Sequence, residues 1–153
     1  MTTKLKDKQS VLMPKTVQVK YIADYEPKFA TEGSAGFDLQ TVQKERIYPG
    51  TMTKVDLGIK FEIPKGYYLE IVPRSSLQKL GLILGNCVGI IDQDYKGEVF
   101  AGLRNLGKNK VILEKGERVV QGILRKSENV ELVPTKTLTK TNRGEGGYGS
   151  TGK

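Results

Sequence analysis

Turn residues divide residues 16–134 into short segments, and this division constrains the fold more than any other feature of the sequence. Apolar and polar residues alternate in 17–21, 59–63 and 69–71, the period of a half-buried strand. Turn pairs such as Pro49-Gly50 and Lys65-Gly66 separate the segments. About ten short strands at this spacing, with no rhythm of strand and long helix, predict an all-β sandwich or barrel. Further expected strands are 52–56, 82–84, 88–91, 99–103, 110–113, 119–124 and 130–133.

Residues 75–81 differ from the rest because they predict one short helix. Ser75 and Ser76 can cap its N-terminus, and Gly81 can end it. The N–H groups at a helix start, with Arg74 alongside, attract phosphate. Two serine caps beside a surface arginine would give the same pattern, so both interpretations stand.

The sequence contains no histidine, which excludes imidazole bases and histidine-ligated metals. Acid–base chemistry then falls to carboxylates, lysine or tyrosine, and a divalent ion would be a hard ion bound through oxygen. The single cysteine, Cys87, lies among apolar residues, so we expect a small buried core residue rather than a nucleophile. One cysteine cannot form a disulfide within the chain, which favours a reducing cytoplasm.

The net charge of +8 is concentrated at the two ends of the chain. Residues 1–20 contain five lysines and one aspartate, and residues 136–153 contain four basic residues and one glutamate, so the body is nearly neutral. A duplex-binding domain carries its basic stripe on the fold itself. We therefore expect a small anionic ligand rather than nucleic acid. No apolar run reaches membrane-spanning length, and no membrane contact is expected.

Five of the last eleven residues are glycine, so residues 143–153 cannot build a core or a stable helix. Arg143, Tyr148, Ser150 and Thr151 nevertheless supply groups that bind phosphate oxygens and cover a flat base. The combination predicts a flexible arm that orders over a nucleotide, with a disordered basic end as the alternative. The expected division is a flexible basic extension over 1–15, a β-domain over 16–135 and the glycine-rich arm over 136–153.

Residues 86–98 contain the strongest internal signal for a site. They predict a β-hairpin with Asp92, Asp94 and Tyr95 at its bend. Backbone N–H and C=O groups of a hairpin can pair with the edge of a base, and Tyr95 offers a flat wall for a sugar. A carboxylate near phosphates suggests a water-activating base or a metal link. An acidic turn without function would have the same composition.

Two further polar residues, Asp38 and Gln121, are weak signals by themselves. Asp38 follows a glycine turn at the start of a predicted strand, and Gln121 stands among apolar neighbours. A residue of either kind is more often solvated than functional.

Taken together, five segments in order resemble the motifs of the homotrimeric dUTPase family. They are 35–39, 73–77, 89–97, 118–121 and the glycine-rich tail, and the match spans residues 35–152. The resemblance implies an all-β jelly-roll or distorted barrel with one short helix, in a homotrimer with active sites shared between subunits. It also implies hydrolysis of dUTP to dUMP and pyrophosphate with Mg²⁺, which lowers dUTP and supplies dUMP for thymidylate synthesis.

The resemblance further implies a role for each matching residue. Asp92 would activate the attacking water, Tyr95 would pack on the deoxyribose and exclude a 2′-hydroxyl, and Asp38 would order the site through metal-bound water. The other contacts implied within the β-domain are Arg74, Ser75 and Ser76 on the phosphate chain, Gln121 near the α-phosphate, and Asn86, Gly89, Ile90 and Ile91 at the uracil edge. The tail of a neighbouring subunit would contribute Tyr148 on the uracil, Arg143, Ser150 and Thr151 at the γ-phosphate, and Gly149.

A few features depart from the family pattern. Ser76 stands where many relatives have glycine, and this difference affects only the fine geometry of the second motif. We attribute the other departures, Val120 and Gly122 in the fourth motif, to packing. The basic N-terminal extension has no counterpart among the motifs.

Two rival functions stay open: a dCTP deaminase-like nucleotide enzyme, and a nucleotide-responsive regulatory β-domain that binds a protein partner.

Overall fold

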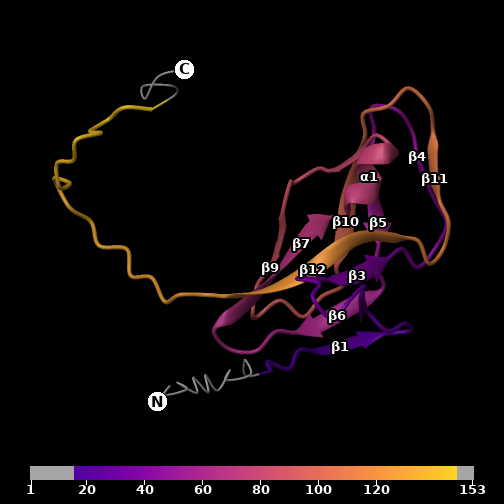
Figure 1. Ribbon diagram of the computed structural model, residues 1–153, viewed down its shortest axis with the longest axis horizontal. Helices are drawn as coiled ribbons and strands as arrows, with labels where there is room; N and C mark the ends of the chain where they lie inside the picture. The colour runs from indigo at the N-terminus through magenta and orange to yellow at the C-terminus, as the bar shows by residue number, and fades with distance from the viewer. Residues whose placement is uncertain (1–15, 148–153) are drawn as a thin grey trace, which may run out of the picture.

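A computed structural model describes residues 16–147 of the chain, and antiparallel strands make up most of its ordered body (Figure 1). Residues 1–15 and 148–153 lie outside the described part. The expectation of an all-β fold with one short helix is confirmed for residues 16–147. The elements are β1 (Lys20–Ala23), β2 (Lys28–Phe29), β3 (Phe37–Gln40), β4 (Glu45–Ile47), β5 (Met52–Asp56), β6 (Ile59–Glu62), β7 (Tyr67–Pro73), α1 (Ser75–Lys79), β8 (Leu82–Leu84), β9 (Gly89–Ile91), β10 (Phe100–Asn105), β11 (Val111–Leu113) and β12 (Arg118–Lys126).

The strands form one large sheet and three smaller ones around a common core. The large sheet has the order β2-β3-β12-β7-β9, the three-stranded sheet has the order β5-β10-β8, and β1-β6 and β4-β11 form pairs. In the large sheet β12 lies between β3 and β7 and pairs with both in antiparallel register. Among residues 16–147 no helix has the length and apolar character needed to cross a membrane.

Alternation of apolar and polar residues places the core as the sequence predicts. In β6 the side chains of Ile59 and Phe61 are buried, whereas Lys60 and Glu62 between them are exposed. The two faces of a strand receive successive side chains, so a period of two buries every second residue. The largest fully buried side chains of the core include Leu39, Ile47, Leu57, Ile59, Leu69, Ile71, Leu82, Leu103 and Leu113.

The strand next to Gly122 leaves no room for a side chain at that position. Gly122 lies in β12 opposite Phe37 of β3. A Cβ at position 122 would lie 2.6 Å from the Phe37 ring and would force it to move. This close approach supports the assignment of Gly122 to packing.

Two strand predictions are wrong. Residues 130–133 form no strand: Val130, Leu132 and Val133 are exposed, and no strand within residues 16–147 pairs with them. In Figure 1 residues 127–147 run away from the barrel as an extended arm. The hairpin predicted over 86–98 is also absent, because β9 pairs with β7 whereas β10 pairs with β5 and β8. The strands that flank the acidic loop therefore belong to different sheets.

Cys87 is exposed, which corrects the expectation of a buried core residue. It lies in the turn that joins β8 to β9, and its φ of 61° is in the left-handed region. The Cys87 N–H donates to the carbonyl of Leu84 at 3.0 Å and closes the turn. The apolar neighbours that suggested burial belong to β8, where Leu82 and Leu84 alone face the core.

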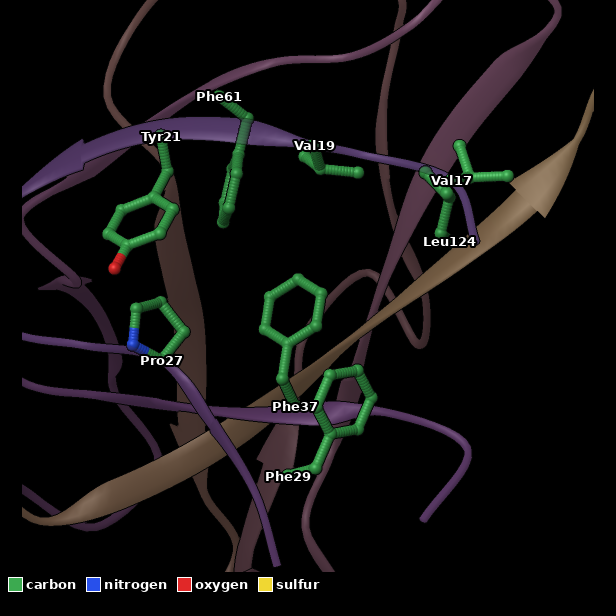
Figure 2. Close-up of a pocket in the computed structure, with 8 residues that line it drawn as sticks. All are labelled: Val17, Val19, Tyr21, Pro27, Phe29, Phe37, Phe61 and Leu124. Atoms are coloured by element: carbon green, nitrogen blue, oxygen red, sulfur yellow. The ribbon is translucent and has the colours of Figure 1, made fainter. Parts of the chain in front are cut away.

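One apolar pocket of the described chain is lined by none of the predicted site residues. Figure 2 shows Phe37 and Phe61 pointing into the same space from opposite sides. The Phe37 ring centroid lies 5.8 Å from that of Phe61 and 5.7 Å from that of Phe29, and the Phe29–Phe37 pair is edge-to-face. The pocket has a volume of about 280 Å³ and is lined by Val17, Val19, Tyr21, Pro27, Phe29, Phe37, Phe61 and Leu124.

Candidate active site

A buried carboxylate between two arginines forms the centre of the first part of the site. Asp38 lies in β3, and its side chain is only 4% exposed. The Arg74 Nε lies 2.8 Å from Asp38 Oδ1, and the Arg118 Nη1 lies 3.0 Å from Asp38 Oδ2. Two guanidinium groups therefore face one carboxylate, which leaves net positive charge at the surface of this cluster. The interpretation of Asp38 as a solvated turn residue is wrong.

Gln121 joins the same cluster from the central strand. It lies in β12 opposite both Asp38 and Val72, and its Nε2 donates to Asp38 Oδ1 at 3.4 Å. The Arg74 Nη1 also donates to the backbone carbonyl of Arg118 at 3.3 Å, which links β12 to the end of β7. The structure thus brings together Asp38, Arg74 and Gln121, three of the predicted site residues.

Arg118 is a site residue that sequence reasoning did not single out. It lies in the fourth motif, three residues before Gln121. Because successive side chains of a regular strand point to opposite faces, an odd spacing would place Arg118 and Gln121 on opposite faces of the sheet. A register shift between Arg118 and Val120 breaks the regular alternation. Such a β-bulge redirects a side chain and leaves no periodic signal in the sequence.

Ser75 and Ser76 lie beside this cluster at the start of α1, and both are exposed. The prediction that they cap the helix is wrong: Arg74 occupies the N-cap position, and no side-chain capping hydrogen bond forms. Their hydroxyls are consequently not engaged as caps. Beside them lies a groove lined by Arg74, Ser76, Leu77, Lys79, Leu80, Leu113, Gly116, Glu117, Arg118 and Val119.

The predicted base-reading residues lie on β9 and the turn before it. β9 is an edge strand of the large sheet within the described residues, with β7 on one side only. An edge strand presents backbone N–H and C=O groups that no neighbouring strand takes up. Asn86 precedes β9 in the turn, close to Gly89. Because residues of an antiparallel strand bond to their neighbour alternately, part of the backbone of Gly89–Ile91 faces away from β7 at the sheet edge.

Asp92 and Tyr95 lie in the exposed loop from β9 to β10. The Asp92 side chain forms no hydrogen bond or ion pair with any of residues 16–147. The Tyr95 N–H donates to the Asp92 carbonyl at 3.1 Å, and the Tyr95 hydroxyl donates to the Glu98 carbonyl at 2.8 Å. A groove beside the loop is lined by Lys65, Gly66, Tyr67, Tyr68, Asp92, Gln93, Asp94, Ser127, Glu128 and Asn129.

The two parts of the candidate site lie near opposite ends of β7. Ile91, the residue before Asp92, is opposite Leu69, whereas Arg74 follows the last residue of β7. Five steps along the chain lead from Leu69 to Arg74, which in extended strand geometry is a rise of about 17 Å. Asp92 also lines a different groove from Arg74. One chain therefore does not bring its carboxylate at position 92 to its own arginine cluster.

Arg143 is the one predicted tail contact that the structure describes. It lies on the exposed arm, and its Nε donates to the carbonyl of Gly146 at 3.0 Å. Tyr148, Gly149, Ser150 and Thr151 lie outside the described residues. Arg143 forms no hydrogen bond or ion pair with the barrel, as far as residues 16–147 show.

The donor groups suit a magnesium ion only if it arrives with phosphate. Among residues 16–147 no three acidic or cysteine side chains gather into a ligand cluster. Both oxygens of Asp38 already face arginines. Mg²⁺ keeps several waters and is commonly held by one or two carboxylates together with substrate phosphates. The indirect link between Asp38 and such an ion therefore stays a prediction.

Comparison with known proteins identifies the family that these parts belong to. The model of the dUTPase family matches residues 25–152. The chain is 42% identical over 129 residues to the deoxyuridine 5′-triphosphate nucleotidohydrolase of Finegoldia magna, covering 82% of this chain and 90% of the relative. It is 41% identical over 145 residues to that of Fusobacterium nucleatum, covering 91% and 99%. The crystal structure of the Streptococcus mutans dUTPase superposes with a TM-score of 0.68 at 36% identity, covering 74% of this chain and 98% of that one.

Proposed function

The chain belongs to the dUTPase family, and on that premise we propose that it hydrolyses dUTP to dUMP and pyrophosphate at sites shared between subunits of a homotrimer. One observation carries the shared site: a single chain holds the carboxylate of Asp92 and the cluster around Arg74 at opposite ends of β7. A second copy of the chain can supply the missing half, as closed rotational symmetry allows.

Asp92 is the proposed general base. Its carboxylate is exposed and unpaired within the described chain, so it is free to accept a proton. In the proposed step a water oxygen forms a bond to the α-phosphorus while Asp92 takes the water proton. The bond between the α-phosphorus and the bridging oxygen breaks, and pyrophosphate leaves with that oxygen.

The arginine cluster is the proposed phosphate site. The two positive charges of Arg74 and Arg118 exceed the single negative charge of Asp38, and Ser75 and Ser76 follow Arg74 at the start of α1. Gln121 would orient an oxygen of the α-phosphate from the centre of the sheet. Fixed donors that face developing negative charge stabilise the transition state of phosphoryl transfer without reorganising.

Magnesium is the proposed cofactor, bound through the phosphate chain and linked to Asp38 by water. When bound, the ion neutralises the charge of the triphosphate. Asp38 keeps Arg74 and Arg118 in place at the same time, because each of its oxygens faces one of them.

Base and sugar recognition falls to β9 and the following loop. The free edge of β9 can pair through its backbone with the uracil edge, together with Asn86. Tyr95 would stand against the deoxyribose. A rigid ring at that place leaves no space for a 2′-hydroxyl, which separates dUTP from UTP.

The arm supports assembly from several copies. Val130 is 75% exposed, Leu132 88% and Val133 72%. Exposed apolar side chains on a segment that leaves its own barrel are typical of a contact with another chain. Beyond them the tail would close over the nucleotide of a neighbouring subunit, with Tyr148 on the base and Arg143, Gly149, Ser150 and Thr151 around the phosphates.

Two incubations test the proposed reaction. Pure protein with dUTP should release pyrophosphate, and EDTA should suppress the release. Ammonia released from dCTP would instead support the deaminase alternative. Nucleotide binding without turnover of either substrate would favour the regulatory β-domain and its protein partner.

We expect the enzyme to act in the cytoplasm.

A further inference from the structure

Gly97 lies under the ring of Tyr95 and leaves no space of its own for a side chain. A Cβ at position 97 would lie 2.5 Å from the Tyr95 hydroxyl oxygen, 2.7 Å from Cζ and 3.1 Å from Cε2. The φ of Gly97 is not among the positive values of the chain, so the backbone conformation does not require glycine there. Glycine at this position therefore makes room for the ring.

The hydroxyl of Tyr95 is held where Gly97 gives it room. It donates to the carbonyl of Glu98 at 2.8 Å, so the ring folds back over the end of its own loop. The Tyr95 backbone N–H donates to the Asp92 carbonyl at 3.1 Å. Both ends of this tyrosine are thus tied to the loop that carries the proposed base.

The backbone of the loop is anchored more firmly than the ring. The Gln93 Oε1 accepts a hydrogen bond from the N–H of Gly66 at 3.2 Å, and the Lys96 Nζ donates to the carbonyl of Gln93 at 2.7 Å. After the loop, Val99 is buried and its N–H donates to the carbonyl of Ile59 at 2.9 Å. The Tyr95 side chain is 42% exposed, so the ring rather than the backbone would yield to an added methyl group.

From this geometry we propose that Gly97 is a specificity-determining position, which fixes the Tyr95 ring as the wall that excludes a ribonucleotide. This inference rests on the proposed function, because it requires Tyr95 to face the sugar. Gly97 itself touches no substrate and acts as a positioning residue. An alanine at position 97 would push the ring away and break its hydrogen bond to Glu98, which opens space for a 2′-hydroxyl.

The test compares the kcat/KM of the full chain for dUTP with that for UTP. We expect Gly97→Ala to lower the ratio of the two values by about 10-fold or more, because the wall against the extra hydroxyl is lost. Gly33→Ala is the matched control, since a Cβ at position 33 meets nothing within 4 Å. An unchanged ratio in Gly97→Ala would overturn the proposal, even if turnover of both substrates fell together.

Tyr95→Phe tests whether the effect of Gly97→Ala depends on the Tyr95 hydroxyl. It removes the atom nearest to the added methyl group, so Gly97→Ala should change the ratio less in the Phe background than in the Tyr background. If Gly97→Ala does not fold, Tyr95→Phe alone must lower the ratio, because the bond to Glu98 is gone. Equal ratios for Tyr95→Phe and the original chain would then contradict the proposal.

The design separates this inference from the proposed function. If the unaltered chain does not hydrolyse dUTP, the proposed function fails. If it hydrolyses dUTP selectively and the ratio is insensitive to position 97, the reaction stands and the positioning role fails.

Discussion

The two ends of the outer face of the large sheet each hold a carboxylate against arginine, but in different surroundings. Asp38 is 4% exposed and faces two guanidinium groups, those of Arg74 and Arg118. At the other end Glu70 is 20% exposed and accepts from one arginine, Arg125, and from the Tyr68 hydroxyl. The first end carries surplus positive charge suited to an anion. The second end is balanced.

The contrast supports the proposal that one chain holds half of a site at each end of the sheet. Tyr68 lines the groove that also contains Asp92, a carboxylate whose side chain has no partner among residues 16–147. The arginine cluster has the charge for phosphate but lacks a free base, because both oxygens of Asp38 are taken. Substitutions at either end should therefore have distinct consequences.

The largest expected effect is that of Asp92→Asn. Loss of the general base should lower kcat by about 10²–10⁴-fold. Folding should be unaffected, since the side chain is exposed and makes no contact that the fold needs. Asp94→Asn in the same loop is the matched control and should stay far more active. Near-normal turnover by Asp92→Asn would remove Asp92 from the proposed role.

Removal of residues 143–153 should come next in size. The remaining chain keeps every strand and the arginine cluster, so folding and assembly should persist. Turnover should fall by about 10²-fold or more, the cost of losing fixed donors to the phosphate chain. Size-exclusion chromatography and a pyrophosphate assay on the same sample check both parts. Full activity of the shortened chain would contradict closure by the tail.

Arg118→Met and Arg125→Met compare the two ends directly. The two arginine side chains are almost equally exposed, at 55% and 53%, so the carboxylates make the difference. Arg118→Met strips one partner from a buried carboxylate and should cost about 1–2 kcal/mol, less than a complete loss of pairing because Arg74 remains. Arg125→Met should cost less. Urea unfolding at one protein concentration measures both, and the reverse order would contradict the contrast.

The pH dependence at the Glu70 end should be the smallest effect. Arg125, and then the Tyr68 hydroxyl, hold the pKa of Glu70 below its ordinary value. A lowered pKa in the folded state means that Glu70 contributes stability above its ordinary pKa, and that this contribution disappears as the pH falls through the folded value. Glu70→Gln should therefore destabilise the protein more near pH 7 than at an acidic pH below the ordinary pKa of glutamate. Unfolding curves at the two pH values give the comparison.

Local patterns in the sequence predict the parts of the fold that depend on neighbours in the chain. The period of two in β6 buries Ile59 and Phe61, and Gly81, with a φ of 70°, follows the helix over Ser75–Lys79 where the sequence predicts its end. The pairing of β9 with β7 is not encoded locally, since the loop after β9 resembles a hairpin bend. The bulge that redirects Arg118 leaves no period, and the turn that exposes Cys87 takes a backbone conformation that the composition does not reveal.

The site was predictable where side-chain chemistry is distinctive, and not where geometry between strands decides. The composition of the acidic loop with Tyr95 indicates a site for a nucleotide, and so does the composition of the glycine-rich tail. The burial of Asp38 between two arginines depends on β3, β7 and β12 meeting in one register. Residues 130–133 have the composition of a strand but lack a partner among residues 16–147, so they form no strand there.

Mixing two inactive variants tests the shared site most directly. Asp92→Asn and Arg74→Ala, each with its own affinity tag, are combined by co-expression, and assemblies that carry both tags are assayed with dUTP. If each site takes Asp92 from one chain and Arg74 from another, every doubly tagged trimer has one site in three with both residues intact, and activity returns to roughly a third of that of the unaltered chain. If both residues act from the same chain, every site carries one lesion. Doubly tagged assemblies as inactive as the parents would contradict the shared site.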